Sequence, residues 1–242
     1  MKNSLLSVSL VVFLIACQSK STEQRSESSA INPTEKTTDG YILLFDGKTL
    51  QGWRTYKNKP NNSWEVADGI LHCKPFQDGI ENFRSDLITE EQYENFELQF
   101  EWKISHQGNS GVIFRVSEDY NESFQTGPEY QVLDDENYPG DVKNEHFSGG
   151  NFGMHAPQNK ILNPVGEWNN SKLIVNGNHV EHWLNGSKTV EYELYSEDWT
   201  NLKNNSKWVE FPEYATVKKG YIALQDHSSE VWYRNIKIKV LD

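Results

Sequence analysis

A chain of 242 residues with eight tryptophans, eleven tyrosines and eleven phenylalanines is long enough to bury one sizeable hydrophobic core. Its net charge of −12 disfavours nucleic acid as a partner, because phosphate backbones attract basic proteins. With only two cysteines, the core has to hold the fold without a network of disulfide bonds.

The first residues have the pattern of a bacterial export signal. Lys2 precedes an apolar run that ends at Ala16 and is too short to span a membrane as a helix. The run closes on Leu-Ile-Ala-Cys17, which resembles a lipobox, in which cleavage before the cysteine leaves a thiol that carries lipid. We therefore expect a lipid anchor at Cys17, which tethers the protein to a membrane without spanning it. The alternative is an ordinary secretory signal with an incidental cysteine.

Residues 18–39 are rich in Ser, Thr, Glu, Gln and Lys and nearly devoid of large apolar side chains. Such a segment cannot bury enough surface to order itself, so we expect a disordered tether. This division predicts a lipoprotein signal at 1–17, the tether at 18–39 and one folded domain at 40–242. Gln18 gives no retention signal for the inner membrane, so we expect an outer-membrane anchor facing the periplasm.

Short alternating runs of apolar and polar residues follow, which is typical of β-strands. Ala67-Asp68-Gly69 and Asn176-Gly177-Asn178 each separate two such runs and predict hairpins. The strand predicted at 96–104 buries one face, made of Phe96, Leu98, Phe100, Trp102 and Ile104.

The same period in the next run predicts that Val112, Phe114 and Val116 share a buried face, opposite Ile113 and Arg115. Later in the chain it predicts a strand with Ile222 and Leu224 on one face, and a last long strand at 231–240. A short helix is expected around 196–202, where acidic residues occupy the first turn.

Glycine and proline are dense from 125 to 165, which predicts long loops interrupted by one strand at 129–133. Long ordered loops on a rigid scaffold of strands usually shape a binding cleft. The predicted architecture is an all-β sandwich whose substrate contacts come from this region.

Several segments, taken in order, resemble the 3-keto-disaccharide hydrolase family. They are LFDGKTLQGW at 44–53, NSGVIFR at 109–115, EYQVLDD at 129–135, GEWN at 166–169, HWLNG at 182–186, LQDH at 224–227 and YRNIKI at 233–238. The resemblance implies a concanavalin A-like jelly roll of two antiparallel sheets, with long loops over a concave face. The stretch Gly150-Asn151-Phe152-Gly153 departs from the Gly-Ala-Leu-Tyr type of sequence expected in that loop, which bears on substrate preference more than on the fold.

The resemblance also implies cleavage of 3-keto-glycosides or 3-keto-disaccharides by an unusual route. A ketone at C3 acidifies the proton on C2; its removal gives an enolate that expels the group on C1, and water then adds to the unsaturated sugar. This chemistry needs a base near C2, a cation or donor for the enolate oxygen, and an acid for the leaving oxygen. A divalent metal could serve the second need. The Glu-x-Asp-x-x-Glu strand of laminarinase-type glycosidases is absent, so a retaining double-carboxylate mechanism is disfavoured.

Glu129 is the first candidate for the base, because it shares a strand face with Gln131 beside the long loops; it could instead be a buried structural carboxylate. Arg115 is the candidate cation, although structural pairing with a carboxylate is equally common. His227 is the candidate acid or enolate donor, or else it only closes a turn. Glu101, on the polar face of its strand, could be a second acid or a metal ligand, or be simply solvated.

The expected substrate contacts are Asn109, Gln131, Asp134, His155, His182, Trp183 and Gln225. His182 and Trp183 lie on opposite faces of one strand, so only one of them can face a sugar, and the apolar neighbours of His182 weaken its claim. No cluster of cysteine and histidine has zinc spacing, and no nucleophile elbow is present.

Two functions of different classes remain: an enzyme that cleaves 3-keto-glycosides, and a non-catalytic, lectin-like carbohydrate-binding module on the same jelly roll. The enzyme is favoured because Glu129, Gln131, Arg115 and His227 are expected on adjacent strands, and a lectin seldom needs that many ionisable groups.

Overall fold

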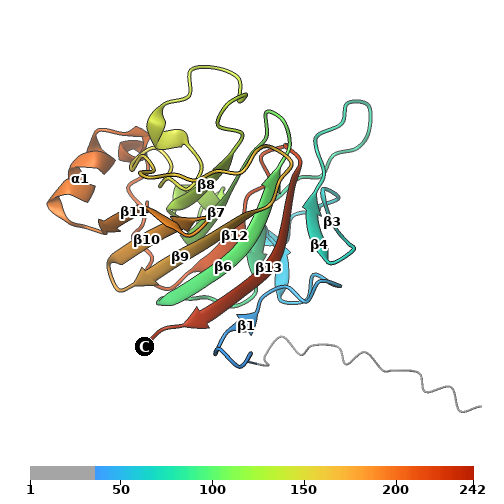
Figure 1. The fold of residues 1–242 in the computed structure, drawn as a ribbon, viewed down its shortest axis with the longest axis horizontal. Helices are drawn as coiled ribbons and strands as arrows, with labels where there is room; N and C mark the ends of the chain where they lie inside the picture. Colours follow the sequence, from blue (N-terminus) through green and yellow to red (C-terminus); the bar gives the residue numbers. More distant parts are fainter. Residues whose placement is uncertain (1–35) are drawn as a thin grey trace, which may run out of the picture. The chain divides into compact units, whose positions relative to one another are not determined.

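Two antiparallel sheets packed face to face form the computed structural model, which describes residues 36–242 (Figure 1). The eight-stranded sheet has the order β11-β10-β9-β6-β13-β4-β3, with β1 paired to β13. Its strands are β1 (Ile42–Leu43), β3 (Trp64–Ala67), β4 (Ile70–Cys73), β6 (Phe96–Ile104), β9 (Asn169–Asn176), β10 (His179–Leu184), β11 (Ser187–Glu193) and β13 (Val231–Val240).

The five-stranded sheet has the order β2-β5-β12-β7-β8 and lies behind the other sheet in Figure 1. Its strands are β2 (Trp53–Thr55), β5 (Leu87–Thr89), β12 (Tyr221–Leu224), β7 (Asn109–Val116) and β8 (Glu129–Leu133). One α-helix, α1 (Glu197–Asn204), lies beyond the edge strand β11, and four 3-10 turns complete the described elements: η1 (Tyr56–Asn58), η2 (Ser123–Gln125), η3 (Asn144–His146) and η4 (Lys207–Glu210). The predicted all-β sandwich is confirmed.

Strict alternation on β6 builds the core between the sheets. Its five odd positions along the strand are buried and its four others half-buried, as the period of two requires. Trp102 is fully buried there and its indole N–H donates to Ser171 Oγ at 2.8 Å. Phe100 and Tyr130 meet edge to face across the sandwich, with ring centroids 5.4 Å apart. The predicted inner face of this strand is confirmed.

The other local predictions on turns and helix ends are also confirmed. The β3–β4 hairpin turns at Asp68 and Gly69, both with positive φ, which suits a primed two-residue turn. Helix α1 starts where Ser196 accepts a hydrogen bond from the backbone N–H of Trp199 at 3.2 Å.

A bulge in β7 overturns the expected facing of Arg115. Tyr221 pairs with Val116 and Ala223 with Ile113, so one more residue lies on β7 than on β12 between these pairs. Arg115 takes up the extra residue with a φ of 58°, and Val116 then joins Ile113 rather than Phe114. Arg115 is therefore turned into the sandwich, away from the face of Ile113.

The predicted tether ends earlier than expected. Lys36 forms an antiparallel bridge with Ile42, and the backbone N–H of Thr37 donates to the Tyr41 carbonyl at 2.7 Å. Asp39 pairs with Lys237 of β13 at 3.3 Å, so residues 36–39 belong to the fold. The predicted export signal, the lipid site at Cys17 and the rest of the tether lie outside the described residues. No helix among residues 36–242 is long and apolar enough to cross a membrane.

His182 of β10 is buried between the sheets beside two tyrosine rings. Its ring centroid lies 5.0 Å from that of Tyr130 and 5.9 Å from that of Tyr192. Neither ring nitrogen makes a well-formed hydrogen bond, although the backbone of Gly149 and Gly150 lies near. Burial lowers the pKa of His182 from 6.5 to about 3, so the folded protein holds this imidazole neutral.

Replacing His182 with phenylalanine should flatten the loss of stability in mild acid. Between pH 6.5 and 5.5 the unfolded chain binds a proton at this position that the folded chain refuses, so folding weakens as the pH falls. The variant lacks this contribution. Between pH 6.5 and 5.5 its free energy of unfolding should therefore fall by about 1 kcal/mol less than that of the wild type, since 2.303RT is about 1.4 kcal/mol. Denaturant unfolding at several pH values measures the difference; two parallel profiles would refute the buried neutral imidazole.

Candidate active site

Glu129, the first residue of β8, points away from the core. Tyr130 and Val132 of the same strand are fully buried between the sheets, so Glu129 and Gln131 lie on the outer face of the five-stranded sheet. The Glu129 side chain nevertheless reaches only 3% exposure, because loops cover it. It is a carboxyl group on the floor of a covered site.

Gly111 of β7 makes room for this carboxyl group. A Cβ atom on Gly111 would lie 2.0 Å from Glu129 Oε1, so the carboxyl group packs directly over the glycine backbone. Gly111 pairs with Gln131 in the ladder, two positions from the pair of Ile113 with Glu129. Glycine therefore occupies this position inside a strand because a side chain would collide with Glu129, and not because a turn is needed.

Two amide side chains extend the site along the sheet. When the amide nitrogen of Gln131 is directed at Glu129, it donates to Oε1 at 3.2 Å and to the Ser110 carbonyl at 3.1 Å. Asn109 lies on the other side of Gln131, with 3.2 Å between the two side chains. Gln131 therefore orients Glu129, and Asn109 continues the row of polar groups.

The surroundings of Glu129 favour its protonated form more than those of an ordinary glutamate. Burial raises the pKa of the Glu129 carboxyl from 4.5 to about 8, and Asp86 contributes in the same direction. The positive charge of Lys207 opposes the rise. A carboxyl group that titrates near neutral pH can take up or release a proton under working conditions.

Lys207, at the start of η4, carries this charge. Its ammonium nitrogen lies 4.2 Å from the ring centroid of Phe152 and 4.4 Å from that of Trp208. The side chain is open to solvent, yet the protein atoms around it lower the pKa of Lys207. It forms no ion pair within 4.0 Å with a carboxylate of residues 36–242, whereas arginines such as Arg84 and Arg234 do.

His227 and Gln225 follow β12 and approach the same face. The backbone N–H of Gln225 donates to the Gly111 carbonyl at 2.9 Å, and Gln225 keeps the outward parity of Ala223. His227 is exposed to solvent, yet desolvation by the surrounding protein atoms lowers the pKa of its imidazole; its own backbone and the charge of Asp226 oppose this, and the charge of Lys207 adds a small lowering effect. At neutral pH this histidine is mainly neutral and offers one N–H donor and one acceptor.

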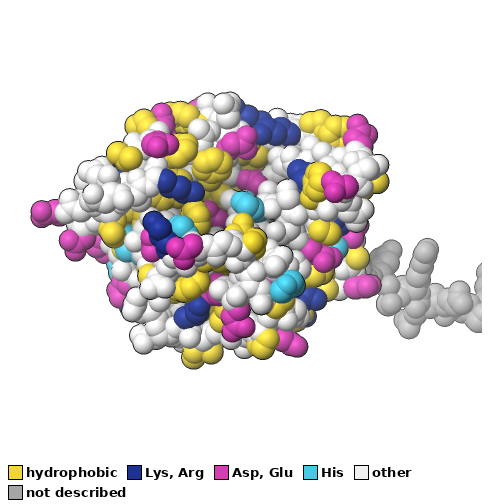
Figure 2. Space-filling view, turned by 90° about the horizontal axis from the view of Figure 1, so that it is seen from above, with side chains coloured by type: hydrophobic (Ala, Val, Ile, Leu, Met, Phe, Trp, Pro, Cys, Tyr) yellow, Lys and Arg dark blue, Asp and Glu magenta, His cyan; other side chains and the backbone are white. Residues whose placement is uncertain are grey.

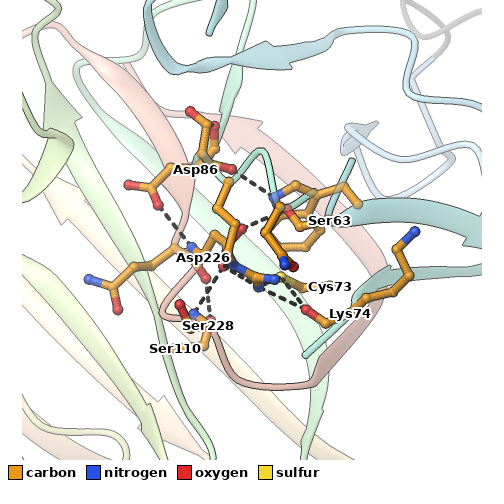
Figure 3. A network of polar contacts seen from close by, with 12 residues as sticks. Ser63, Cys73, Lys74, Asp86, Ser110, Asp226 and Ser228 are labelled. Atoms are coloured by element: carbon orange, nitrogen blue, oxygen red, sulfur yellow. Dashed lines mark hydrogen bonds and ion pairs between the residues drawn. The ribbon is translucent and has the colours of Figure 1, made fainter. Parts of the chain in front are cut away.

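A buried ion pair holds the segment that carries His227 (Figure 3). Asp226 is paired with Arg84 at 2.5 Å and accepts from Ser63 Oγ at 2.6 Å. Its backbone N–H donates to Asp86 Oδ1 at 2.8 Å, and Asp86 also accepts from Ser123 of η2. Burial raises the pKa of Asp86 to about 6. The loop after β12, the loop before β5 and η2 are thereby joined at one end of the five-stranded sheet.

The face seen from above relative to Figure 1 is hollowed near its centre, and basic, acidic and histidine side chains lie there among apolar ones (Figure 2). A hollow of this mixed character is where small-molecule sites are usually found.

The fold brings together five of the predicted residues, namely Glu129, Gln131, Asn109, Gln225 and His227. Lys207 and Asp86 join them, and neither was predicted. No motif marks Lys207, which follows the only α-helix of the described residues by a few positions. Asp86 gives no signal either, because it lies between the loop that carries Arg84 and the three-residue strand β5. Their approach depends on how distant segments fold over the sheet.

The predicted cation Arg115 is not part of the site. The guanidinium donates to the Gly177 carbonyl at 2.6 Å and to the Tyr195 hydroxyl at 3.2 Å, at the β9–β10 turn of the opposite sheet. The β7 bulge accounts for this orientation.

Glu101 and Trp183 lie on the outer face of the eight-stranded sheet, on the opposite side of the sandwich from Glu129. Glu101 is paired with Arg234 at 2.7 Å and accepts from Asn235 at 2.8 Å. Trp183 donates to Glu181 at 2.7 Å and its ring is covered by the ammonium of Lys172, 4.3 Å from the centroid. The expectation that they act with Glu129 was wrong, because strand parity sends them to the other surface.

His182, His155 and Asp134 have structural surroundings. His182 is the fully buried imidazole described above, so it cannot contact a substrate. His155 stacks on Tyr192 with centroids 4.5 Å apart, and burial lowers its pKa to about 4. Asp134 accepts from the backbone N–H groups of Gln107 and Asn137 at 2.8 and 3.1 Å and so closes the loop after β8.

Within residues 36–242, one group of three side chains has ligand atoms close enough for a metal ion: His179, Glu181 and Glu191. They lie on the outer face of β10 and β11, and Lys188 already pairs with Glu191 and approaches Glu181 at 3.6 Å. This group does not fit a metal that would act on a substrate held at Glu129, because the two lie on opposite surfaces.

The chain is similar over most of its length to proteins of carbohydrate metabolism. The sequence profile of the 3-keto-alpha-glucoside-1,2-lyase-like domain matches residues 40–239. A 3-keto-disaccharide hydrolase from Bacteroides thetaiotaomicron is 37% identical over 236 residues, which cover 84% of this chain and 79% of that protein. These matches confirm the resemblance expected from the motifs.

Solved structures share the fold. A protein from Parabacteroides distasonis, described as a candidate glycosyl hydrolase, superposes with a TM-score of 0.79 at 37% identity, over 88% of this chain and 99% of that one. A second protein from that organism, with the same description, gives 0.60 at 26% identity over 83% and 99%. A Bacillus subtilis protein with a galectin-like fold gives 0.52 at 13% identity over 78% and 89%, which supports the fold alone.

Gly111→Ala should be costly only while Glu129 is present. The added methyl group collides with the carboxyl group, so the substitution should lower the free energy of unfolding by about 1–3 kcal/mol. In a Glu129→Ala background the same change should be neutral, or stabilising by up to about 1 kcal/mol, since Gly111 has no positive φ. Denaturant unfolding of the four proteins measures the coupling. An equal cost in both backgrounds would contradict the contact.

Proposed function

We propose that this chain, which belongs to the 3-keto-alpha-glucoside-1,2-lyase-like family, cleaves 3-keto-glycosides at the outer face of the five-stranded sheet, where Glu129 lies. The observation that carries the proposal is a buried carboxyl group whose pKa is raised to about 8, beside amides, a neutral imidazole and an ammonium group. Perturbed ionisable groups gathered in one hollow are typical of catalytic sites.

Glu129 is suited to abstract the proton on C2. The C–H electron pair becomes the C2–C3 double bond of an enolate, and the ketone π pair moves onto the oxygen at C3. Re-forming the ketone moves the double bond to C1–C2 and breaks the bond from C1 to the leaving oxygen, which takes the proton that Glu129 removed from C2. Water then adds its hydroxyl group to C1 and its other proton to C2 by way of the ionised Glu129, which ends the cycle as a carboxylate. A base whose pKa lies close to the working pH does this most effectively.

The neighbours of Glu129 suit the remaining needs of this reaction. Gln131 fixes the carboxyl group, and Asn109 and Gln225 offer amide groups to sugar hydroxyls along the same face. His227 can donate a hydrogen bond from its N–H to the leaving oxygen, since the neutral imidazole keeps one N–H donor.

The alternative, a non-catalytic carbohydrate-binding module, would need open aromatic faces on which sugars stack. Three tryptophans of the outer face of the eight-stranded sheet are covered by cations instead. Lys103 lies 4.3 Å from the Trp232 centroid, Arg234 lies 4.0 Å from that of Trp168, and Lys172 covers Trp183. This favours the enzyme.

Glu129→Gln should abolish turnover without unfolding the protein. Release of the leaving group from a 3-keto-glycoside should fall about a thousandfold or more, because the amide cannot accept the C2 proton. The free energy of unfolding should change by less than about 1 kcal/mol, since a protonated carboxyl and an amide are similar in a buried site. Glu65→Gln, on the outer face of the β3–β4 hairpin, is the matched control and should keep full activity. An active Glu129→Gln protein would refute the role of Glu129.

The pH dependence separates a base from an acid. If the ionised carboxylate abstracts the proton, kcat/KM of the wild type rises with pH and levels off above about 8, the pKa of Glu129. If the protonated form acted as the acid, kcat/KM would fall over the same range. Initial rates from pH 6 to 9.5 decide between these opposite slopes.

We also propose that Cys17 carries lipid and holds the domain at the outer membrane, facing the periplasm. The supporting observations are the apolar run that closes on Leu-Ile-Ala-Cys17 and the polar segment behind it. Cys17→Ser should move the protein from the membrane fraction to the soluble fraction and prevent labelling by a radioactive fatty acid. Membrane retention of this variant would contradict the lipid anchor.

A further inference from the structure

The ammonium group of Lys207 is held in place by aromatic rings from three separate segments. Phe152 belongs to the long loop, Trp208 to η4, and Phe124 to η2, with Nζ 4.2, 4.4 and 5.9 Å from the respective ring centroids. Contacts of this kind hold a cation without neutralising its charge. The positive charge therefore stays available at a defined position.

These rings are linked to the backbone of Glu129. The Trp208 indole N–H donates to the Phe152 carbonyl at 3.0 Å, and the Phe152 N–H donates to the Glu129 carbonyl at 3.1 Å. Ser206 Oγ accepts from the Trp208 N–H at 3.2 Å and so fixes the start of η4. The position of Lys207 relative to the floor of the site is thus set by hydrogen bonds as well as by ring contacts.

Two arginines near the five-stranded sheet already have carboxylate partners. Arg54 pairs with Glu118 at 2.6 Å, and Arg84 pairs with Asp226 at 2.5 Å. Arg115, the cation expected from the sequence, donates to a backbone carbonyl across the sandwich. Lys207 has no such partner in the part of the chain that the structure describes, and its charge influences the pKa of both Glu129 and His227. The adjoining cavity is lined by Lys143, Glu145 and His146, whose ring is tilted against that of Phe152 with centroids 4.7 Å apart.

We propose that Lys207 is a catalytic residue that binds the C3 oxygen of the sugar and stabilises the negative charge that develops there. This inference rests on the proposed cleavage of 3-keto-glycosides. As Glu129 takes the C2 proton, the ketone π pair moves onto the C3 oxygen, which then accepts a hydrogen bond from the ammonium group. When the leaving oxygen departs from C1, the pair returns to the ketone and Lys207 keeps its proton throughout. A fixed cation is worth most against charge that appears only in the transition state.

Lys207 has a second effect that a merely structural lysine would lack. Its charge favours the ionised form of Glu129, so it keeps the base usable nearer to neutral pH. Removing the charge should therefore shift the pH profile as well as lower the rate.

The test compares Lys207→Met, Lys207→Arg and the control Lys143→Met, which removes an exposed lysine that lines the same cavity of about 540 Å³. With a 3-keto-glycoside as substrate, Lys207→Met should lower kcat about a hundredfold, the loss typical of one oxyanion contact, with a much smaller change in KM. The acid limb of its kcat/KM profile should move upward by about one pH unit. Lys207→Arg should recover part of the rate and most of the pH profile, and Lys143→Met should behave as the wild type.

Circular dichroism and thermal unfolding establish that each variant is folded. An active wild type together with a Lys207→Met protein that keeps its kcat and its acid limb would overturn this inference and leave the proposed function intact. The inference would also be overturned if the folded Lys207→Met and Lys207→Arg proteins lost kcat to the same extent and neither shifted the acid limb. Such a result would mean that only the packing of the lysine side chain matters. A wild type that releases no leaving group from 3-keto-glycosides would overturn both.

Discussion

The burial of one carboxyl group, that of Glu129, against the glycine backbone of the neighbouring strand is the constraint on which the site depends. A carboxylate without a salt bridge in such a place is costly, which is why its pKa rises toward 8. The cost is tolerated because Gly111 leaves space, Gln131 donates to the group, and the charge of Lys207 favours its ionised form. These three contributions come from three different segments of the chain.

The rigid sandwich makes this arrangement possible. Nearly continuous burial along β7 and β8 leaves little freedom in the strands that carry Asn109, Gly111, Glu129 and Gln131. The loops above are tied down by polar contacts of their own, above all the Asp226–Arg84 pair, the contact of Asp226 with Asp86 shown in Figure 3, and the contact of Asp86 with Ser123. The buried strands thus form a rigid base for the site, whereas Lys207 and His227 are exposed to solvent.

The contrast between Arg115 and Lys207 shows where reasoning from periodicity ends. Alternation placed the inner faces of β6 and β12 correctly and put Glu129 and Gln131 together on one strand face. It failed at Arg115, because a single extra residue in β7 reverses the facing of every residue after it. It was silent on Lys207, since no local pattern records which loop folds over which strand.

By itself the sequence determined the long strands β6 and β13, the two hairpin turns, the start of the helix and the family, because all of these follow from local spacing, local turn chemistry and the order of short motifs. Tertiary structure alone decided which of the ionisable residues meet. Glu101 and Trp183 went to the opposite surface, His182 into the core, and Lys207 and Asp86 into the site. The physical reason is that distances between segments far apart in the chain depend on sheet order, bulges and loop paths, which adjacent residues do not encode.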